Sequence, residues 1–131
     1  MAKHVIPGAG LKFDCSHLLL NVVAATSSYI CIIPLVLIDM FVWQFQNIYF
    51  RTFEIPLVSR KEYVVLDRYK LHKLTFWQKF NCLYCEYANG VVAYVKAVVN
   101  RMELYSCAIK HVHEPRGQEH QKNFFERKDF E

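Results

Sequence analysis

The chain has 131 residues, of which 53% are apolar and 15% aromatic, and a formal net charge of +4. This length allows one compact domain, or a membrane anchor with a modest domain outside the membrane, and the composition excludes an intrinsically disordered chain. The five cysteines are an odd number and do not follow the pattern of a secreted disulfide framework.

The net charge is confined to the middle of the chain. Residues 1–50 and 110–131 each sum to zero, whereas residues 51–109 carry nine Lys/Arg against five Asp/Glu. The sequence contains no recognisable nucleic-acid-binding module, and the excess is small. Because each Lys or Arg near an anionic membrane surface contributes about 1 kcal/mol of attraction, we expect the lipid bilayer, and no nucleic acid, as a partner.

An apolar stretch of 24 residues, Cys15 to Ile38, contains no charged side chain. As a helix it would be about 36 Å long, enough to cross a bilayer, and it is longer than the core of a signal peptide. We predict a loop over residues 1–17, then a transmembrane helix with an interfacial extension over residues 18–50. Pro34 should kink this helix. A hairpin of two short passes that turns at Pro34 is the alternative.

Charges near the predicted span, about Leu18 to Ile38, indicate its orientation. Asp39 would lie at the membrane edge, where a charge is tolerated. Two cations precede the span and four follow it, which predicts a single-pass protein with a cytoplasmic C-terminus. The reducing cytoplasm favours free thiols or metal thiolates over disulfides. The flanking cations are Lys3 and Lys12 before the span, and Arg51, Arg60, Lys61 and Arg68 after it.

Beyond the anchor we predict a small, basic, helical domain over residues 51–113 and a mobile charged tail over residues 114–131, so the fold class is mainly α. Residues 62–67 form a short apolar run that fits either a helix or a strand. From Thr75, a possible helix cap, apolar residues recur at steps of three and four, which predicts a helix with one apolar face. Asn89-Gly90 is its weak point, either a tolerated glycine or a turn. The face comprises Phe76, Phe80, Leu83, Tyr87, Val91, Tyr94, Val98, Met102 and Tyr105.

Four side chains in this domain could bind a metal ion. Cys82 and Cys85 lie at i, i+3, and Cys107 and His111 lie at i, i+4, so each pair can share one ion. Three thiolates and one imidazole form the closed tetrahedral set that is typical of structural zinc, and a sulfur-rich site also suits iron. We therefore predict a Cys3His site for Zn or Fe, with no catalytic residue assigned.

Geometry restricts this metal site. An unbroken helix from Cys82 to Tyr105 would hold the two pairs about 35 Å apart. Three arrangements remain: a helix break near Val95, a site shared by two antiparallel protomers, or separate pairs with His72 joining Cys107 and His111.

Two further readings of the cysteines stay open. They can be inert buried thiols, because free cysteine is among the most buried residue types. Alternatively, Cys82 and Cys85 form a redox dithiol activated by Lys73 and Lys79, although the βαβ context of thioredoxin-like CxxC motifs is missing.

Three runs of sequence carry a resemblance: LDRYKL (66–71), KFNCLYCEYANGVVAYV (79–95) and RMELYSCAIKH (101–111). Together they resemble a group of small bacterial membrane proteins with an NCxYCxYANG…C-x3-H pattern, over about Ile33 to His111. That group has Trp-Cys-Pro-Ile-Lys-His at the place of Ser106 to His111, so Ser106 and Ala108 depart from it, while Cys107 and His111 match. The group has no assigned activity, and the resemblance implies bacterial origin and a membrane location, not a reaction. Together with the predicted orientation, we expect a protein of the bacterial inner membrane.

These observations predict a small integral membrane protein with a Cys3His metal site, acting as an accessory or interaction protein, alone or as a homo-oligomer. One alternative is a membrane-tethered dithiol oxidoreductase. The other is a small structural subunit of a larger membrane complex.

Overall fold

The computed structural model describes residues 18–131, so the loop predicted for residues 1–17 lies outside the described residues. The described chain is mainly helical, as predicted, and contains no β-strand, only an isolated bridge between Ile109 and Phe125.

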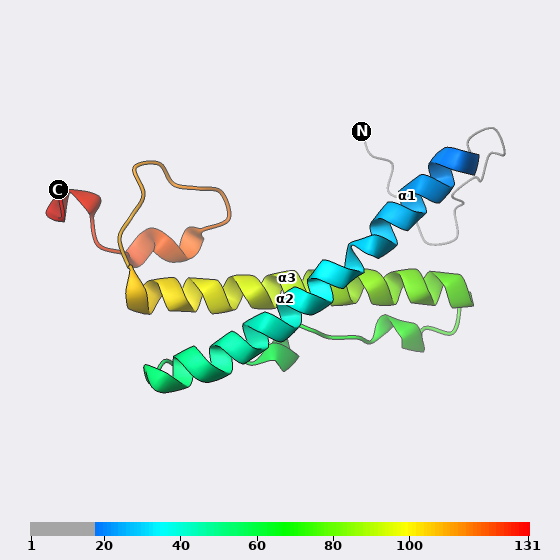
Figure 1. Cartoon of the computed structure of the whole chain (residues 1–131), viewed down its shortest axis with the longest axis horizontal. Coiled ribbons are helices and arrows are strands. Elements are labelled where there is room, and N and C mark those ends of the chain that lie inside the picture. Colours follow the sequence, from blue (N-terminus) through cyan, green and yellow to red (C-terminus); the bar gives the residue numbers. More distant parts are fainter. Residues whose placement is uncertain (1–17) are drawn as a thin grey trace.

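A long N-terminal helix runs in a single direction (Figure 1). It consists of α1 (Leu18–Ile30), α2 (Ile32–Phe45) and the π-helical turn η2 (Gln46–Phe50). The alternative hairpin is wrong, because α1 and α2 follow one another instead of folding back. The helix is interrupted at Cys31, close to Pro34, which has no N–H to donate to the Ile30 carbonyl. A kink at Pro34 stays a prediction.

The second long helix, α3 (Phe76–Ser106), is 31 residues long and passes through Asn89-Gly90 without a turn. A capping box forms its start, as a cap at Thr75 predicted. The Thr75 side chain accepts a hydrogen bond from the backbone of Gln78, and the Thr75 N–H donates to Gln78 Oε1 at 2.9 Å. The helix predicted from the spacing of apolar residues is confirmed.

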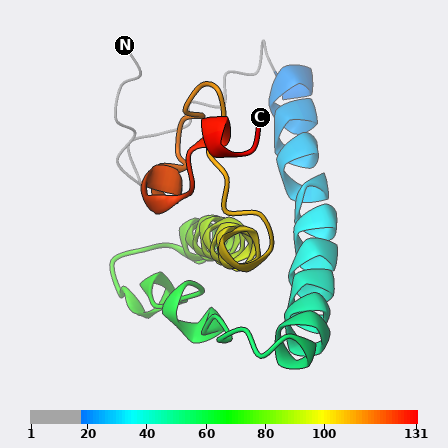
Figure 2. The same ribbon diagram turned by 90° about the vertical axis from the view of Figure 1, so that its left-hand side faces the viewer.

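Three parts of the chain surround α3, which Figure 2 shows nearly end-on. The long N-terminal helix lies on one side, the connecting segment 51–75 on a second side and the C-terminal segment on a third. The connecting segment contains two short 3-10 helices, η3 (Arg60–Glu62) and η4 (Arg68–Lys70). Its apolar run at residues 62–67, predicted as helix or strand, is mostly irregular.

The core lies where the connecting segment meets both long helices. Its buried side chains are Phe50, Ile55, Val58, Tyr94 and Val98. The apolar face predicted for α3 is therefore buried only in its middle. Its ends are open, with Phe76 75% exposed and Tyr105 56% exposed.

The connecting segment approaches α3 most closely at Gly90. A Cβ atom at Gly90 would lie 2.7 Å from the carbonyl oxygen of Tyr63 and 2.9 Å from the Cα of Val64. Glycine is therefore needed here for close packing of two backbones, not for a turn.

The C-terminal segment folds back onto the end of α3. It contains η5 (Glu119–Asn123) and η6 (Arg127–Asp129), and Phe124 is buried. Glu103 on α3 contacts His120 Nε2 at 2.7 Å and accepts a hydrogen bond from Gln121 Nε2 at 2.9 Å. Movement of the tail, which we predicted to be mobile, would require these contacts to break.

Burial changes along the N-terminal helix. No residue of α1 is buried, and Asp39 is the one buried residue of α2. From Asp39 onward the helix contributes to the core, with Gln46 and Phe50 buried in η2. The segment Leu18–Phe50 forms a single helix that is long enough and apolar enough to cross a membrane. Most of its exposed large apolar side chains precede Asp39.

Candidate functional site

The four predicted metal ligands lie near opposite ends of α3. Cys82 and Cys85 are in its first third, Cys107 directly follows its last residue, and His111 is four residues further on. The unbroken helix holds the two pairs about 35 Å apart. Among residues 18–131, no group of three or more His, Cys, Asp or Glu side chains is close enough to hold a metal ion.

Two of the three arrangements considered for the metal site are therefore absent from the described chain. α3 does not break near Val95, and His72 precedes the start of α3, at the opposite end from Cys107 and His111. A site shared by two antiparallel chains stays a prediction.

The described cysteines are free thiols. Cys85 and Cys107 are exposed and Cys82 is half-buried, so they are not inert core residues. Cys82 lies beyond the first turn of α3, whereas the helix dipole stabilises a thiolate mainly at the N-terminus of a helix. The local geometry thus gives a redox dithiol little support.

A polar cluster joins the long helix, the connecting segment and α3. Asp39 is 8% exposed and accepts two hydrogen bonds from Arg60, from Nε at 2.9 Å and from Nη2 at 2.5 Å. The Tyr87 hydroxyl donates to the same carboxylate at 3.0 Å. Burial, together with the Asp39 carboxylate, raises the pKa of Tyr87, so this hydroxyl stays protonated and continues to donate.

Four further hydrogen bonds hold the connecting segment in place. The Gln46 side chain donates to the Val58 carbonyl at 3.1 Å and accepts from the Val58 N–H at 2.9 Å. Arg101 Nη1 donates to the carbonyls of Pro56 and Leu57, at 3.2 and 3.1 Å. Side chains of the long helix and of α3 therefore fix the connecting segment by hydrogen bonding to its backbone N–H and C=O groups.

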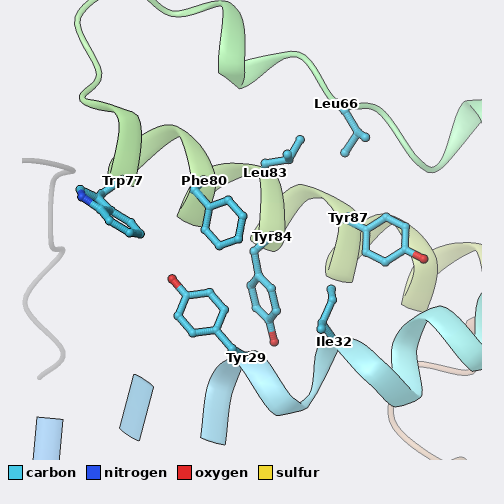
Figure 3. Close-up of a pocket in the computed structure, with 8 residues that line it drawn as sticks. All are labelled: Tyr29, Ile32, Leu66, Trp77, Phe80, Leu83, Tyr84 and Tyr87. Atoms are coloured by element: carbon cyan, nitrogen blue, oxygen red, sulfur yellow. The ribbon is translucent and has the colours of Figure 1, made fainter. Parts of the chain in front are cut away.

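An apolar groove of about 580 Å³ lies between the long helix and the first half of α3 (Figure 3). The rings of Tyr29 and Tyr84 lie side by side between the two helices, with their centroids 5.9 Å apart. The Tyr29 hydroxyl donates to Asn81 Oδ1 at 2.5 Å, and the Tyr84 hydroxyl donates to the Ser28 carbonyl at 2.7 Å. The lining comprises Tyr29, Ile32, Leu66, Trp77, Phe80, Leu83, Tyr84 and Tyr87.

No protein-family model, no curated protein and no solved structure matches this chain.

The sequence reasoning missed the partners of Asp39. A carboxylate close to a long apolar stretch is a signal that a partner is required. Arg60 and Tyr87 are 21 and 48 residues away, however, and no local spacing identifies them. The groove was missed for the same reason, because its two walls are far apart in the sequence.

Proposed function

We propose that this chain is a single-pass protein of the bacterial inner membrane, in which residues 18–38 span the bilayer and the remainder forms a cytoplasmic accessory domain. The supporting observation is the change in burial at Asp39. No residue of the helix before Asp39 is buried, whereas Asp39, Gln46 and Phe50 are buried against the rest of the chain. Met40, Phe41, Trp43 and Ile48 remain exposed after Asp39. In water such exposure would be unfavourable, whereas in lipid it is required.

The four cations that follow residue 38 before Tyr69, against two that precede residue 18, support the cytoplasmic orientation. An accessory role, as an interaction protein or a subunit of a larger complex, fits the chain better than catalysis. Its part-buried polar cluster of Asp39, Arg60 and Tyr87 joins three segments of the chain through its hydrogen bonds.

Cysteine labelling tests the membrane topology. Variants that keep only Cys31 or only Cys107 are treated with a membrane-impermeant maleimide in spheroplasts, in inverted vesicles and in detergent. We expect Cys31 to react only in detergent, and Cys107 to react in inverted vesicles but not in spheroplasts. Release of the protein by alkaline carbonate, or labelling of Cys31 in intact membranes, would overturn the proposed span.

We propose metal binding between two chains as a second function. The observation that favours it is that the CxxC pair and the CxxxH pair lie near opposite ends of one unbroken helix, with Cys85, Cys107 and His111 exposed. Two antiparallel copies of α3 would present the CxxC pair of each chain to the CxxxH pair of the other. The ion, Zn or Fe, would then stabilise a homodimer.

A further inference from the structure

The beginning of α3 and the residues before it carry cations and exposed aromatic rings. Residues 68–85 contain four cations, Arg68, Lys70, Lys73 and Lys79, and no Asp or Glu. Phe76 is 75% exposed and Trp77 is 71% exposed. Among the described residues, Arg68 is the one cation of this stretch in an ion pair, 3.4 Å from Glu86. We call residues 68–80 the basic aromatic surface.

This combination has the chemistry of a membrane–water interface. Trp and other aromatic rings accumulate at the level of the lipid headgroups, and clustered Lys and Arg are attracted to anionic lipids. We infer that the basic aromatic surface docks onto the anionic headgroup layer of the membrane, as a second contact beside the spanning helix. This inference rests on the function proposed above, because it takes residues 18–38 as the span.

Docking at the headgroups requires α1 and α3 to separate. In the structure Tyr29 of α1 contacts Asn81 and Phe80 of α3. Tyr29 is about 15 Å from either end of the span, near the middle of the bilayer. With this contact intact, Lys79 would lie near the same depth, where a charged side chain is unfavourable. Bending the long helix away from α3 relieves the conflict.

The long helix can bend at Cys31. The helix is interrupted there, and the hydrogen bond from the Leu35 N–H to the Cys31 carbonyl is long, at 3.4 Å. No residue of α1 is buried, and the groove beside it is incompletely filled. The residues after Cys31 are held by the Asp39–Arg60 ion pair and by the Gln46–Val58 hydrogen bonds. Separation of α1 from α3 therefore leaves the core intact.

Tryptophan fluorescence tests this docking directly, because the chain has only Trp43 and Trp77. The full chain with Trp43→Phe is reconstituted in phosphatidylcholine vesicles, with or without phosphatidylglycerol. Lipids carry a quencher either near the headgroup or near the end of the acyl chain. With phosphatidylglycerol we expect blue-shifted Trp77 emission that is quenched more strongly by the headgroup label. Stronger quenching by the deep label, or equal access of aqueous iodide in vesicles and in detergent, would overturn the inference.

Charge variants provide the matched control. Replacing Lys70, Lys73 and Lys79 by Gln should abolish the effect of phosphatidylglycerol on Trp77. Replacing Arg116, Lys122 and Lys128 by Gln removes the same charge elsewhere and should leave the effect unchanged. If both triple variants behave alike, the docking is not carried by this surface.

A second tryptophan position separates the two proposals. Val23→Trp in a chain that also carries Trp43→Phe and Trp77→Phe reports on the span. If the deep label fails to quench this tryptophan, the proposed membrane topology fails. If the deep label quenches it and Trp77 is not at the headgroups, only the second membrane contact is wrong.

Discussion

Arg60 and Asp39 form a bidentate ion pair between the connecting segment and the long helix, with Arg60 Nε 2.9 Å from Asp39 Oδ1. Asp39 is the first buried residue of the long helix, since no residue before it is buried. The hydrogen bond to Asp39 raises the pKa of Arg60, which favours the charged guanidinium.

We expect Arg60→Gln to lower the free energy of unfolding by about 1–3 kcal/mol, because Asp39 would keep its burial and lose its charged partner. The loss is smaller than for a fully buried pair, since the Arg60 side chain is 38% exposed. Thermal unfolding in mild detergent measures the change. Lys61→Gln, at the exposed neighbouring position, should change stability by less than about 0.5 kcal/mol. Equal effects of the two substitutions would show that the pair adds nothing to stability.

Gly90→Ala should destabilise the protein although alanine is the better helix former. The gain in helix propensity is about 1 kcal/mol, whereas overpacking typically costs about 1–3 kcal/mol. The neighbours at 2.7 and 2.9 Å are backbone atoms, which cannot rotate away as a side chain can. Asn89→Ala, at an exposed site on the same helix, is the control and should be neutral or stabilising. A higher unfolding temperature for Gly90→Ala would mean that residues 63–64 are free to shift.

Two tyrosines on the same face of α3 should respond differently to removal of the hydroxyl. The Tyr94 hydroxyl is buried without a hydrogen-bond partner, so Tyr94→Phe should be neutral or stabilising. Tyr87→Phe removes the donor to Asp39 and should cost about 1–2 kcal/mol. Urea unfolding of the two variants in the same detergent gives the comparison. A loss for Tyr94→Phe as large as that for Tyr87→Phe would contradict the hydrogen-bond assignment.

Attachment of the C-terminal segment should weaken in acid. The hydrogen bond and the charge of Lys110 hold the pKa of Glu126 below its ordinary value of 4.5, so folding favours the ionised carboxyl. The stabilisation is present above that ordinary value and is lost as the pH falls through the lowered pKa. Hydrogen exchange of the Lys110 and Phe125 amides, which form the bridge between residues 109 and 125, reports the loss. In Glu126→Gln this contribution to the pH dependence should be missing; an unchanged profile would assign it to another group.

Elemental analysis of protein purified anaerobically tests the two-chain metal site. We expect one Zn or Fe per chain, a dimer that dissociates with a chelator, and loss of both metal and dimer in Cys107→Ser. Cys31→Ser is the control, because Cys31 lies outside the predicted ligand set. Metal-free protein, or metal bound to a monomer, would eliminate the shared site.

The helices could be predicted from the sequence because their signals are local. Thr75 followed by apolar residues at steps of three and four defines the start and the face of α3, and the uncharged stretch to Ile38 defines the long helix. Each of these patterns is complete within a few helical turns, so no tertiary information was needed.

The tertiary contacts could not be predicted in the same way. In the sequence, Gly90 indicates a weak point of a helix. Its role in close packing follows only from the position of the backbone of Tyr63 and Val64, which is distant in the sequence. The tail from residue 114 reads as mobile, because its composition is polar and its partner Glu103 lies on another element. The sequence indicated that an unbroken helix would hold the Cys82–Cys85 pair too far from the Cys107–His111 pair, but whether the helix broke could not be determined from Asn89-Gly90.

The order in which the core residues are synthesised has a consequence for the nascent chain. The core joins Phe50, Ile55 and Val58 to Tyr94 and Val98, so it cannot close before Val98 has left the ribosome. Residues 18–38 leave the ribosome about 60 residues before Val98. Because domains generally fold as units during synthesis, these apolar residues are exposed before the core that follows them in the chain has formed. Arg60 follows Asp39 much sooner than Tyr87 does, so the ion pair can form before the hydrogen bond from Tyr87 to the same carboxylate.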